Sequence, residues 1–227
     1  MLVLVTGATG FLGRRVVREL RDRHHQVRCL VHTPGRERMF PDRSVEIHYG
    51  SVSDPAALAD AFYDVEAVVH LVGVIRQRKR LTYDQINRQG VANVVASAVA
   101  NRVKHFIQVS VIGATNDPAY AYFYSKWRGE REVAGGGVPY TIIRSSLMFG
   151  DGDVFINPLA ALTRVFPLVP VVGSVENSVR RSSSRAKSSI ASMGCLPVAS
   201  ASSATFIPSY LRLESLRTST TRILAQL

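Results

Sequence analysis

The stretch LVLVTGATGFLGRRVVREL, residues 2–20, decides the fold, because an apolar run passes straight into glycines at positions 7, 10 and 13 and then into helical spacing. A strand, a glycine-rich turn and a helix in this order form a phosphate-binding unit. Gly7 permits the tight turn, Gly10 lets a pyrophosphate approach the backbone, and Gly13 lets the helix pack against the strand. The free N–H groups at the start of the helix would attract the anion. This context favours a phosphate site over a glycine-rich turn that binds nothing.

The chain up to residue 145 alternates apolar runs with stretches of helical spacing. The runs that predict strands span residues 2–5, 27–31, 44–49, 67–72, 105–111 and 139–144. Helical spacing covers residues 11–24, 55–62 and 82–102, and Ser53 or Asp54 can cap the second of these, with Pro55 in its first turn. The alternation requires crossover connections, so it predicts an α/β fold with a Rossmann-type, doubly wound parallel sheet.

Composition places the chain among globular proteins. Its 227 residues are 46% hydrophobic and 20% charged, enough for one sizeable core or for one domain and part of a second. Two cysteines, Cys29 and Cys195, cannot build a disulfide framework, so the expected location is a reducing cytoplasm. No apolar run reaches the roughly 18 residues that span a bilayer, and no basic segment precedes the first run. We therefore predict neither an integral membrane segment nor a secretory signal.

The net charge of +11 raises the question of nucleic-acid binding. The excess is local, because residues 174–227 hold 7 basic and 2 acidic residues, and the other dense basic run is RQRKR at 76–80. We interpret that run as a solvated loop. Nucleic acid is therefore not an expected partner, and no metal site is predicted.

The sequence changes character after Gly173. Residues 174–227 contain 14 serines and no aspartate, without a sustained period of 2 or 3.6 residues. We divide the chain into a dinucleotide-binding domain at 1–150, a further segment at 151–173 and a Ser/Arg-rich tail at 174–227. The tail is expected to be disordered or the product of a shifted reading frame.

The end of the second predicted strand bears on the choice of cofactor. An NAD site usually carries an acidic residue there, which holds the ribose hydroxyls. Here the strand continues as CLVHTPGRER, with His32 in the expected region and Arg36 and Arg38 after it. A 2'-phosphate would meet positive charge at this place. NADP(H) is therefore favoured, with NAD(H) as the alternative if the arginines are only a solvated loop.

Several segments in a fixed order resemble one superfamily. They are TGATGFLG at 6–13, VVHLVG at 68–73, INRQGVANVV at 86–95, FIQVSVIGA at 106–114, Tyr122-x-x-x-Lys126 and IIRSSLMFGDGD at 142–153. Together they resemble the short-chain dehydrogenase/reductase superfamily in its extended or atypical branch, the NAD-dependent epimerase/dehydratase-like proteins. Within it, HLVGVI, SKWRGE and FPLVPVVG look most like the nucleotide-binding accessory subunit of respiratory complex I and its bacterial relatives. The resemblance implies that residues 151–173 are the start of a C-terminal substrate subdomain, which is expected to be partial or truncated.

The resemblance implies a catalytic pair. Tyr122 would be the general acid/base for an alcohol or carbonyl, and Lys126, four residues on and on the same helical face, would lower the pKa of Tyr122 and hold the nicotinamide ribose. We expect the helix that carries them to begin with Asp117 as its cap and Pro118 in its first turn.

The resemblance also implies where the dinucleotide lies. Ser51 stands where relatives usually carry an aspartate near the adenine. The residues expected to contact the cofactor are Thr6, Gly7, Thr9, Gly10, Phe11, Leu12, Gly13, His32, Arg36, Leu71, Val72, Gly73, Asn87 and Lys126.

A third catalytic group is less well matched. Active relatives end the preceding strand with a run of hydroxyls, whereas here Ser110 is followed by Val111 and Ile112. Ser110 or Thr115 would have to polarise the substrate oxygen.

Three functions stay open on the sequence. The first is an oxidoreductase or epimerase/dehydratase that acts on an unknown small molecule. The second is a non-catalytic nucleotide-binding accessory or assembly factor of respiratory complex I, which would place the protein at the periphery of a membrane. The third is a redox-sensing regulator similar to the NmrA proteins.

Overall fold

A computed structural model describes residues 1–40, 45–78, 81–146, 148, 157, 168–170 and 195–197. Its main sheet has six parallel strands in the order β3-β2-β1-β4-β5-β6. This order confirms the predicted Rossmann-type, doubly wound sheet. The strands are β1 (Leu2–Thr6), β2 (Gln26–Val31), β3 (Val45–Tyr49), β4 (Ala67–His70), β5 (His105–Val111) and β6 (Tyr140–Ser145).

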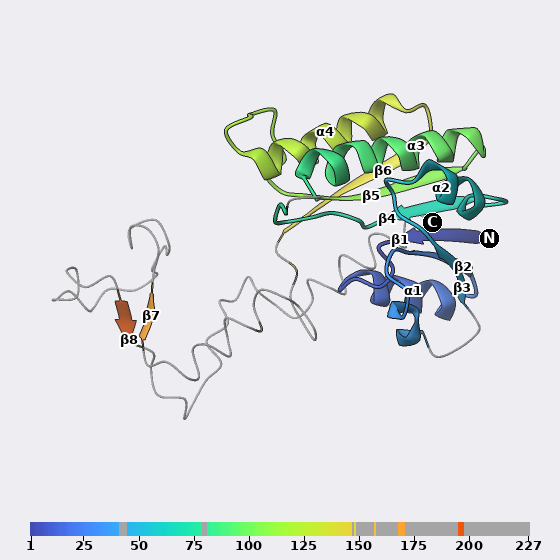
Figure 1. Cartoon of the computed structure of the whole chain (residues 1–227), viewed down its shortest axis with the longest axis horizontal. Coiled ribbons are helices and arrows are strands. Elements are labelled where there is room, and N and C mark those ends of the chain that lie inside the picture. Colours follow the sequence, from blue (N-terminus) through green and yellow to red (C-terminus); the bar gives the residue numbers. More distant parts are fainter. Residues whose placement is uncertain are drawn as a thin grey trace. The chain divides into compact units, whose positions relative to one another are not determined.

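Helices cover both faces of this sheet. Figure 1 shows α1 on one face and α3 and α4 on the other. Right-handed crossovers between parallel strands produce this layering. The helical elements are α1 (Gly13–Asp22), the 3-10 helix η1 (Arg36–Met39), α2 (Pro55–Ala61), the π-helix η2 (Asp84–Gly90), α3 (Val91–Ala100) and α4 (Ala121–Gly135).

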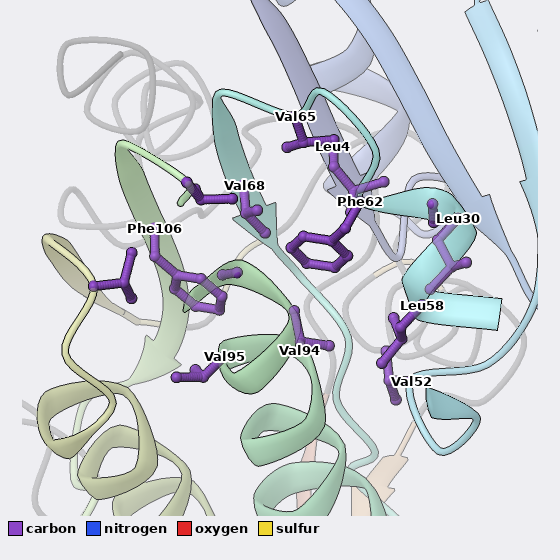
Figure 2. Close-up of a cluster of buried hydrophobic side chains, with 14 of the residues drawn as sticks. Leu4, Leu30, Val52, Leu58, Phe62, Val65, Val68, Val94, Val95 and Phe106 are labelled. Carbon is purple, nitrogen blue, oxygen red and sulfur yellow. The ribbon is translucent and has the colours of Figure 1, made fainter. Parts of the chain in front are cut away.

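The central strand β1 separates two cores by simple alternation. Val3 and Val5 are fully buried in the cluster that includes the apolar face of α1, whereas Leu4 is buried in the cluster on the opposite side. Figure 2 shows this second cluster, with Leu4 and Phe62 among its members. Because successive side chains of a strand point to opposite faces, one apolar run supports both cores.

The element boundaries confirm one predicted cap and correct another. Asp54 caps α2, since its Oδ1 accepts hydrogen bonds from the N–H groups of Ala56 at 3.0 Å and Ala57 at 3.3 Å. The predicted Asp117 cap is wrong, because α4 begins at Ala121. The carboxylate of Asp117 instead accepts a hydrogen bond from its near neighbour Ala119 N–H, at 2.9 Å, in the turn before the helix.

The helix predicted at 82–102 differs from expectation in one respect. Its first part, η2, has π-helical geometry, and regular α-helix begins only at Val91. π-turns inside helices often occur at functional sites. Residue spacing alone did not reveal this turn.

A second unit of the chain begins at Phe149. Its described part contains a two-stranded antiparallel sheet of β7 (Leu168–Pro170) and β8 (Cys195–Pro197). The predicted boundaries at 150 and 173, and most of the predicted tail at 174–227, lie outside the described residues, so they remain predictions. Among the helices that the structure describes, none has the length and hydropathy needed to cross a membrane.

Candidate functional site

The turn between β1 and α1 is shaped by close approaches that only glycine permits. Gly7 has a φ of 76°, and a Cβ there would lie 3.1 Å from the carbonyl carbon of Leu71 and from the nitrogen of Val72. A Cβ on Gly13 would lie 2.2 Å from the carbonyl oxygen of Gly7. The N–H of Gly10 donates to that same oxygen at 3.0 Å. The roles predicted for Gly7 and Gly13 thus correspond to actual contacts.

The start of α1 offers hydrogen-bond donors to an anion. No side chain caps this helix, and within the described part of the chain the N–H groups of Phe11 and Leu12 have no acceptor. The Leu12 side chain is buried and that of Phe11 is partly buried against the same core. A ligand at this turn would therefore meet the backbone of these two predicted residues, not their side chains. Unpaired N–H groups at a helix start favour phosphate.

A cavity of about 240 Å³ adjoins this turn. It brings together several predicted cofactor residues, namely Gly7, Thr9, His32 and Val72, with Ser51 at the place expected for adenine. Sequence reasoning missed other lining residues, because they contribute backbone or apolar surface from separate elements: Leu30, Gly50, Val52, Val74, Leu81 and Ile86.

The loop after β2 is basic, but it also contains an acid that the cofactor argument left out. Arg36 lies in η1 and is exposed, as is His32. The Glu37 carboxylate accepts a hydrogen bond from Gly35 N–H at 2.7 Å. Backbone hydrogen bonds, with smaller effects from Tyr49 and Arg38, lower the pKa of Glu37. This acid is therefore engaged by its own loop.

Asn87, in the middle of η2, joins three segments. Its Oδ1 accepts a hydrogen bond from Val74 N–H at 2.9 Å, and its Nδ2 donates to Val74 O at 3.1 Å and to Ser125 Oγ at 3.0 Å. A Cβ on Gly129 of α4 would lie 2.2 Å from the Asn87 carbonyl oxygen, so α4 packs directly on η2. The Asn87 side chain thus fixes the loop after β4 instead of facing a ligand.

Lys126 reaches the same loop from α4. It is 5% exposed, and its Nζ donates to the carbonyl oxygen of Val109 at 3.0 Å. Burial lowers the pKa of Lys126 to about 8, partly opposed by Glu130. A Cβ on Gly73 would lie 3.6 Å from Nζ. The ammonium group is therefore beside the predicted cofactor residue Gly73.

Tyr122 is held by aromatic neighbours. Its ring centroid lies 5.7 Å from that of Tyr83 and 5.3 Å from that of Phe123. Burial and, to a smaller extent, Tyr83 raise the pKa of Tyr122. The expected lowering by Lys126 is wrong for this state of the chain, because burial dominates and the Lys126 ammonium bonds to Val109 O instead.

Ser110 does not face an open site. It is 1% exposed, and its hydroxyl has no hydrogen-bond partner in the described part of the chain. Val111 is half-buried, Ile112 is 63% exposed, and the alternative Thr115 is half-buried in the loop beyond β5. Among the described residues, no hydrogen bond joins the Ser110 hydroxyl to Tyr122, so the structure gives no support to Ser110 as the catalytic hydroxyl.

A row of buried polar side chains lies in the central strands of the sheet and was not predicted from the sequence. Thr6, His70 and Gln108 are register partners in β1, β4 and β5. Thr6 Oγ1 and His70 Nδ1 are hydrogen-bonded at 2.7 Å, so the predicted cofactor residue Thr6 uses its hydroxyl inside the sheet. Burial, followed by the charge of Lys126, lowers the pKa of His70 to about 3. The sequence did hold a signal for this row, because His70 and Gln108 are polar residues within the otherwise apolar runs AVVHLV and HFIQVSV.

Comparison with known proteins agrees with the phosphate loop and the sheet. Residues 7–153 match a family described as NAD(P)H-binding. A ceramide reductase of Caulobacter vibrioides is 32% identical over 171 residues, covering 75% of this chain and 54% of the relative. The mitochondrial NADH dehydrogenase [ubiquinone] 1 alpha subcomplex subunit 9 of Dictyostelium discoideum is 26% identical over 177 residues, covering 75% of this chain and 49% of the relative.

Among solved structures, the Bordetella bronchiseptica enzyme WbmH in complex with NAD+ shares the fold. Its TM-score is 0.63 at 20% identity, covering 72% of this chain and 62% of that one.

The fold and the glycine turn define a nicotinamide-dinucleotide-binding Rossmann protein. The chain belongs to the NAD(P)H-binding family. This membership and the relatives just described are consistent with the resemblance to the extended or atypical branch of the short-chain dehydrogenase/reductase superfamily. It spans about half the length of the curated relatives named above.

Proposed function

We propose that the protein is an NADPH-dependent reductase of a carbonyl compound. The observation that carries this proposal is the place of Lys126, whose Nζ lies beside Gly73 while the Gly7 turn contacts Leu71 and Val72 of the same loop. The backbone N–H groups that can bind phosphate and the buried Lys126 ammonium thus flank the same loop, the one after β4. An extended dinucleotide requires such an arrangement, with its pyrophosphate at the helix start and its nicotinamide ribose at the lysine.

The state of Tyr122 suits it to the role of proton donor. The bound cofactor would supply a hydride. Because the pKa of Tyr122 is raised above its ordinary value, its phenol stays protonated at neutral pH and can donate a proton to a carbonyl oxygen. Lys126, with a pKa of about 8, is mostly charged at neutral pH and can donate to ribose hydroxyls. The same protonation disfavours alcohol oxidation, which needs a base.

Catalysis is tested with Tyr122→Phe, while Tyr120→Phe, at an exposed tyrosine, is the matched control. Loss of a general acid typically lowers kcat by about 100- to 10,000-fold. We expect that loss for Tyr122→Phe, an unchanged dissociation constant for NADPH, and normal turnover for Tyr120→Phe. The measurement is NADPH oxidation against a panel of carbonyl acceptors. Equal turnover by the two variants would remove Tyr122 from the mechanism.

The preference for NADP(H) is a finer part of the proposal. Arg36 and Arg38 give the loop after β2 positive groups, and the Glu37 carboxylate is engaged by Gly35 N–H. Calorimetric titration should give a lower dissociation constant for NADPH than for NADH. Arg36→Ala should weaken NADPH binding about 5- to 10-fold and leave NADH binding unchanged. Tighter binding of NADH by the unaltered protein would reverse this assignment.

A second candidate is a nucleotide-binding accessory factor without turnover, as a subunit of or assembly factor for a respiratory complex. The burial of the Ser110 hydroxyl and the apolar Val111 and Ile112 favour it, because Ser110 then does not join Tyr122 in polarising a substrate oxygen. This candidate predicts that the dinucleotide binds while Tyr122→Phe changes nothing measurable. The panel of acceptors therefore separates the two functions.

A further inference from the structure

The ring of Tyr122 belongs to an apolar surface. We define the aromatic wall as Tyr83, Tyr122 and Phe123 together with Ile75 and Ile112. The Tyr122 ring lies between the other two rings, at centroid distances of 5.7 and 5.3 Å. Both interplanar angles are steep, 58° and 63°, as aromatic pairs prefer.

Two exposed isoleucines lie next to groups that contact these rings. The Tyr83 hydroxyl donates to the carbonyl oxygen of Ile75 at 3.0 Å, which ties this ring to the loop after β4. At the other end, a Cβ on Gly113 would lie 3.4 Å from the Phe123 ring, and Ile112 directly precedes that glycine. Ile75 is 59% exposed and Ile112 is 63% exposed. Large exposed aliphatic side chains gathered in this way mark a binding surface.

The wall adjoins the nucleotide cavity. Val74, which lines that cavity, directly precedes Ile75, and Asn87 holds Val74 in place. Any molecule that accepts a hydride must lie close to both the nicotinamide and the Tyr122 hydroxyl. Such a molecule therefore contacts the wall.

The polar groups of the wall are almost all engaged. The carboxylate of Asp84, next to Tyr83, pairs with Arg88 at 2.7 Å and with Arg128 at 2.8 Å. The Tyr83 hydroxyl is occupied by Ile75 O. Among the described residues, none accepts a hydrogen bond from the Tyr122 hydroxyl, so that hydroxyl is the polar group left for a ligand.

We propose that the aromatic wall binds a flat, apolar carbonyl compound, with its oxygen at the Tyr122 hydroxyl, and that it disfavours polyhydroxylated sugar nucleotides. This inference rests on the proposed reductase function. A flat ligand covers the rings and the isoleucines without leaving hydroxyls unpaired, whereas a sugar would bury hydroxyls against Ile112 and Phe123.

The test is calorimetric binding of 1,4-naphthoquinone to the full chain saturated with NADP+, with UDP-glucose as the comparison ligand. Phe123→Ser and Ile112→Ser should each weaken naphthoquinone binding about 3- to 10-fold. Val99→Ser is the matched control, because Val99 is 45% exposed on α3, and it should leave binding unchanged. Thermal melting verifies that the variants fold.

The outcomes separate the two proposals. Naphthoquinone binding that falls in both wall variants, with no binding of UDP-glucose, supports the wall. Tighter binding of UDP-glucose, or naphthoquinone affinity equal in all variants, overturns it even if NADPH binds and is oxidised. If the wall variants behave as expected but no acceptor is reduced, the reductase function fails and the wall stands as an apolar binding surface.

Discussion

The candidate site at the carboxyl ends of the strands has two halves, and they are built differently. The half around Gly7 and Gly13 is backbone, with N–H groups and carbonyl oxygens placed by steric contact. The half around Tyr122 and Ser110 is side chain, and each group there depends on neighbours from other elements. The backbone half keeps its geometry if the glycines stay. The chemistry of the side-chain half depends on packing as well as on residue identity, because burial raises the pKa of Tyr122.

Gly13→Ala should break the backbone half and give the largest effect. Its Cβ would lie 2.2 Å from Gly7 O and 2.6 Å from Ala8 O, so backbone atoms must move. We expect unfolding in urea to show a loss of about 1–3 kcal/mol and calorimetry to show NADPH affinity lower by at least about 10-fold. Gly135→Ala, with open space at its Cβ, should be neutral or stabilising. Normal NADPH binding by Gly13→Ala would contradict the backbone argument.

His70 joins the two halves, and its titration should give an intermediate effect. Its folded pKa of about 3 lies below the ordinary 6.5, so the unfolded chain binds a proton that the folded chain excludes. The free energy of unfolding should therefore fall as pH drops below 6.5, by up to about 1.4 kcal/mol per pH unit. His70→Asn should remove this slope in urea titrations between pH 6.5 and 4.5, and His24→Asn should keep it. An unchanged slope in His70→Asn would mean that other groups cause it.

Ser110→Ala should give the smallest effect and sharpen the description of the side-chain half. Its hydroxyl is buried without a described partner, so its removal should be neutral or stabilise the fold by up to about 1 kcal/mol. Turnover by the variant should equal that of the unaltered protein, with Ser146→Ala, just beyond β6, as control. A large loss of kcat at unchanged stability would show that Ser110 takes part in catalysis after all.

The sequence allowed the fold and the backbone half of the site to be predicted, because both depend on local patterns. Apolar runs that alternate with helical spacing fixed the strands, and three glycines at set intervals fixed the turn. Asp54 and Pro55 marked the start of α2 correctly for the same reason.

The side-chain half could not be predicted in the same way. The Thr6–His70 bond joins residues 64 positions apart, and the contacts of Asn87 with Val74 and Ser125 cross three segments. The pKa of Tyr122 depends on how deeply its ring packs beside Tyr83. Such effects arise from packing between distant parts of the chain, which residue spacing does not encode. The π-helical turn of η2 is another feature that residue spacing did not predict.

The central place of β1 has a consequence for the order in which the chain folds. β1 leaves the ribosome before β4, yet one of its edges pairs with β4, which ends at His70. Until that residue emerges, the strand has an open edge on which another chain can pair. The Gly7 turn is likewise complete only when Leu71 and Val72 close over it. The residues of β1 are therefore made well before they reach their final environment, and a nascent chain that stops before residue 72 would be prone to aggregation.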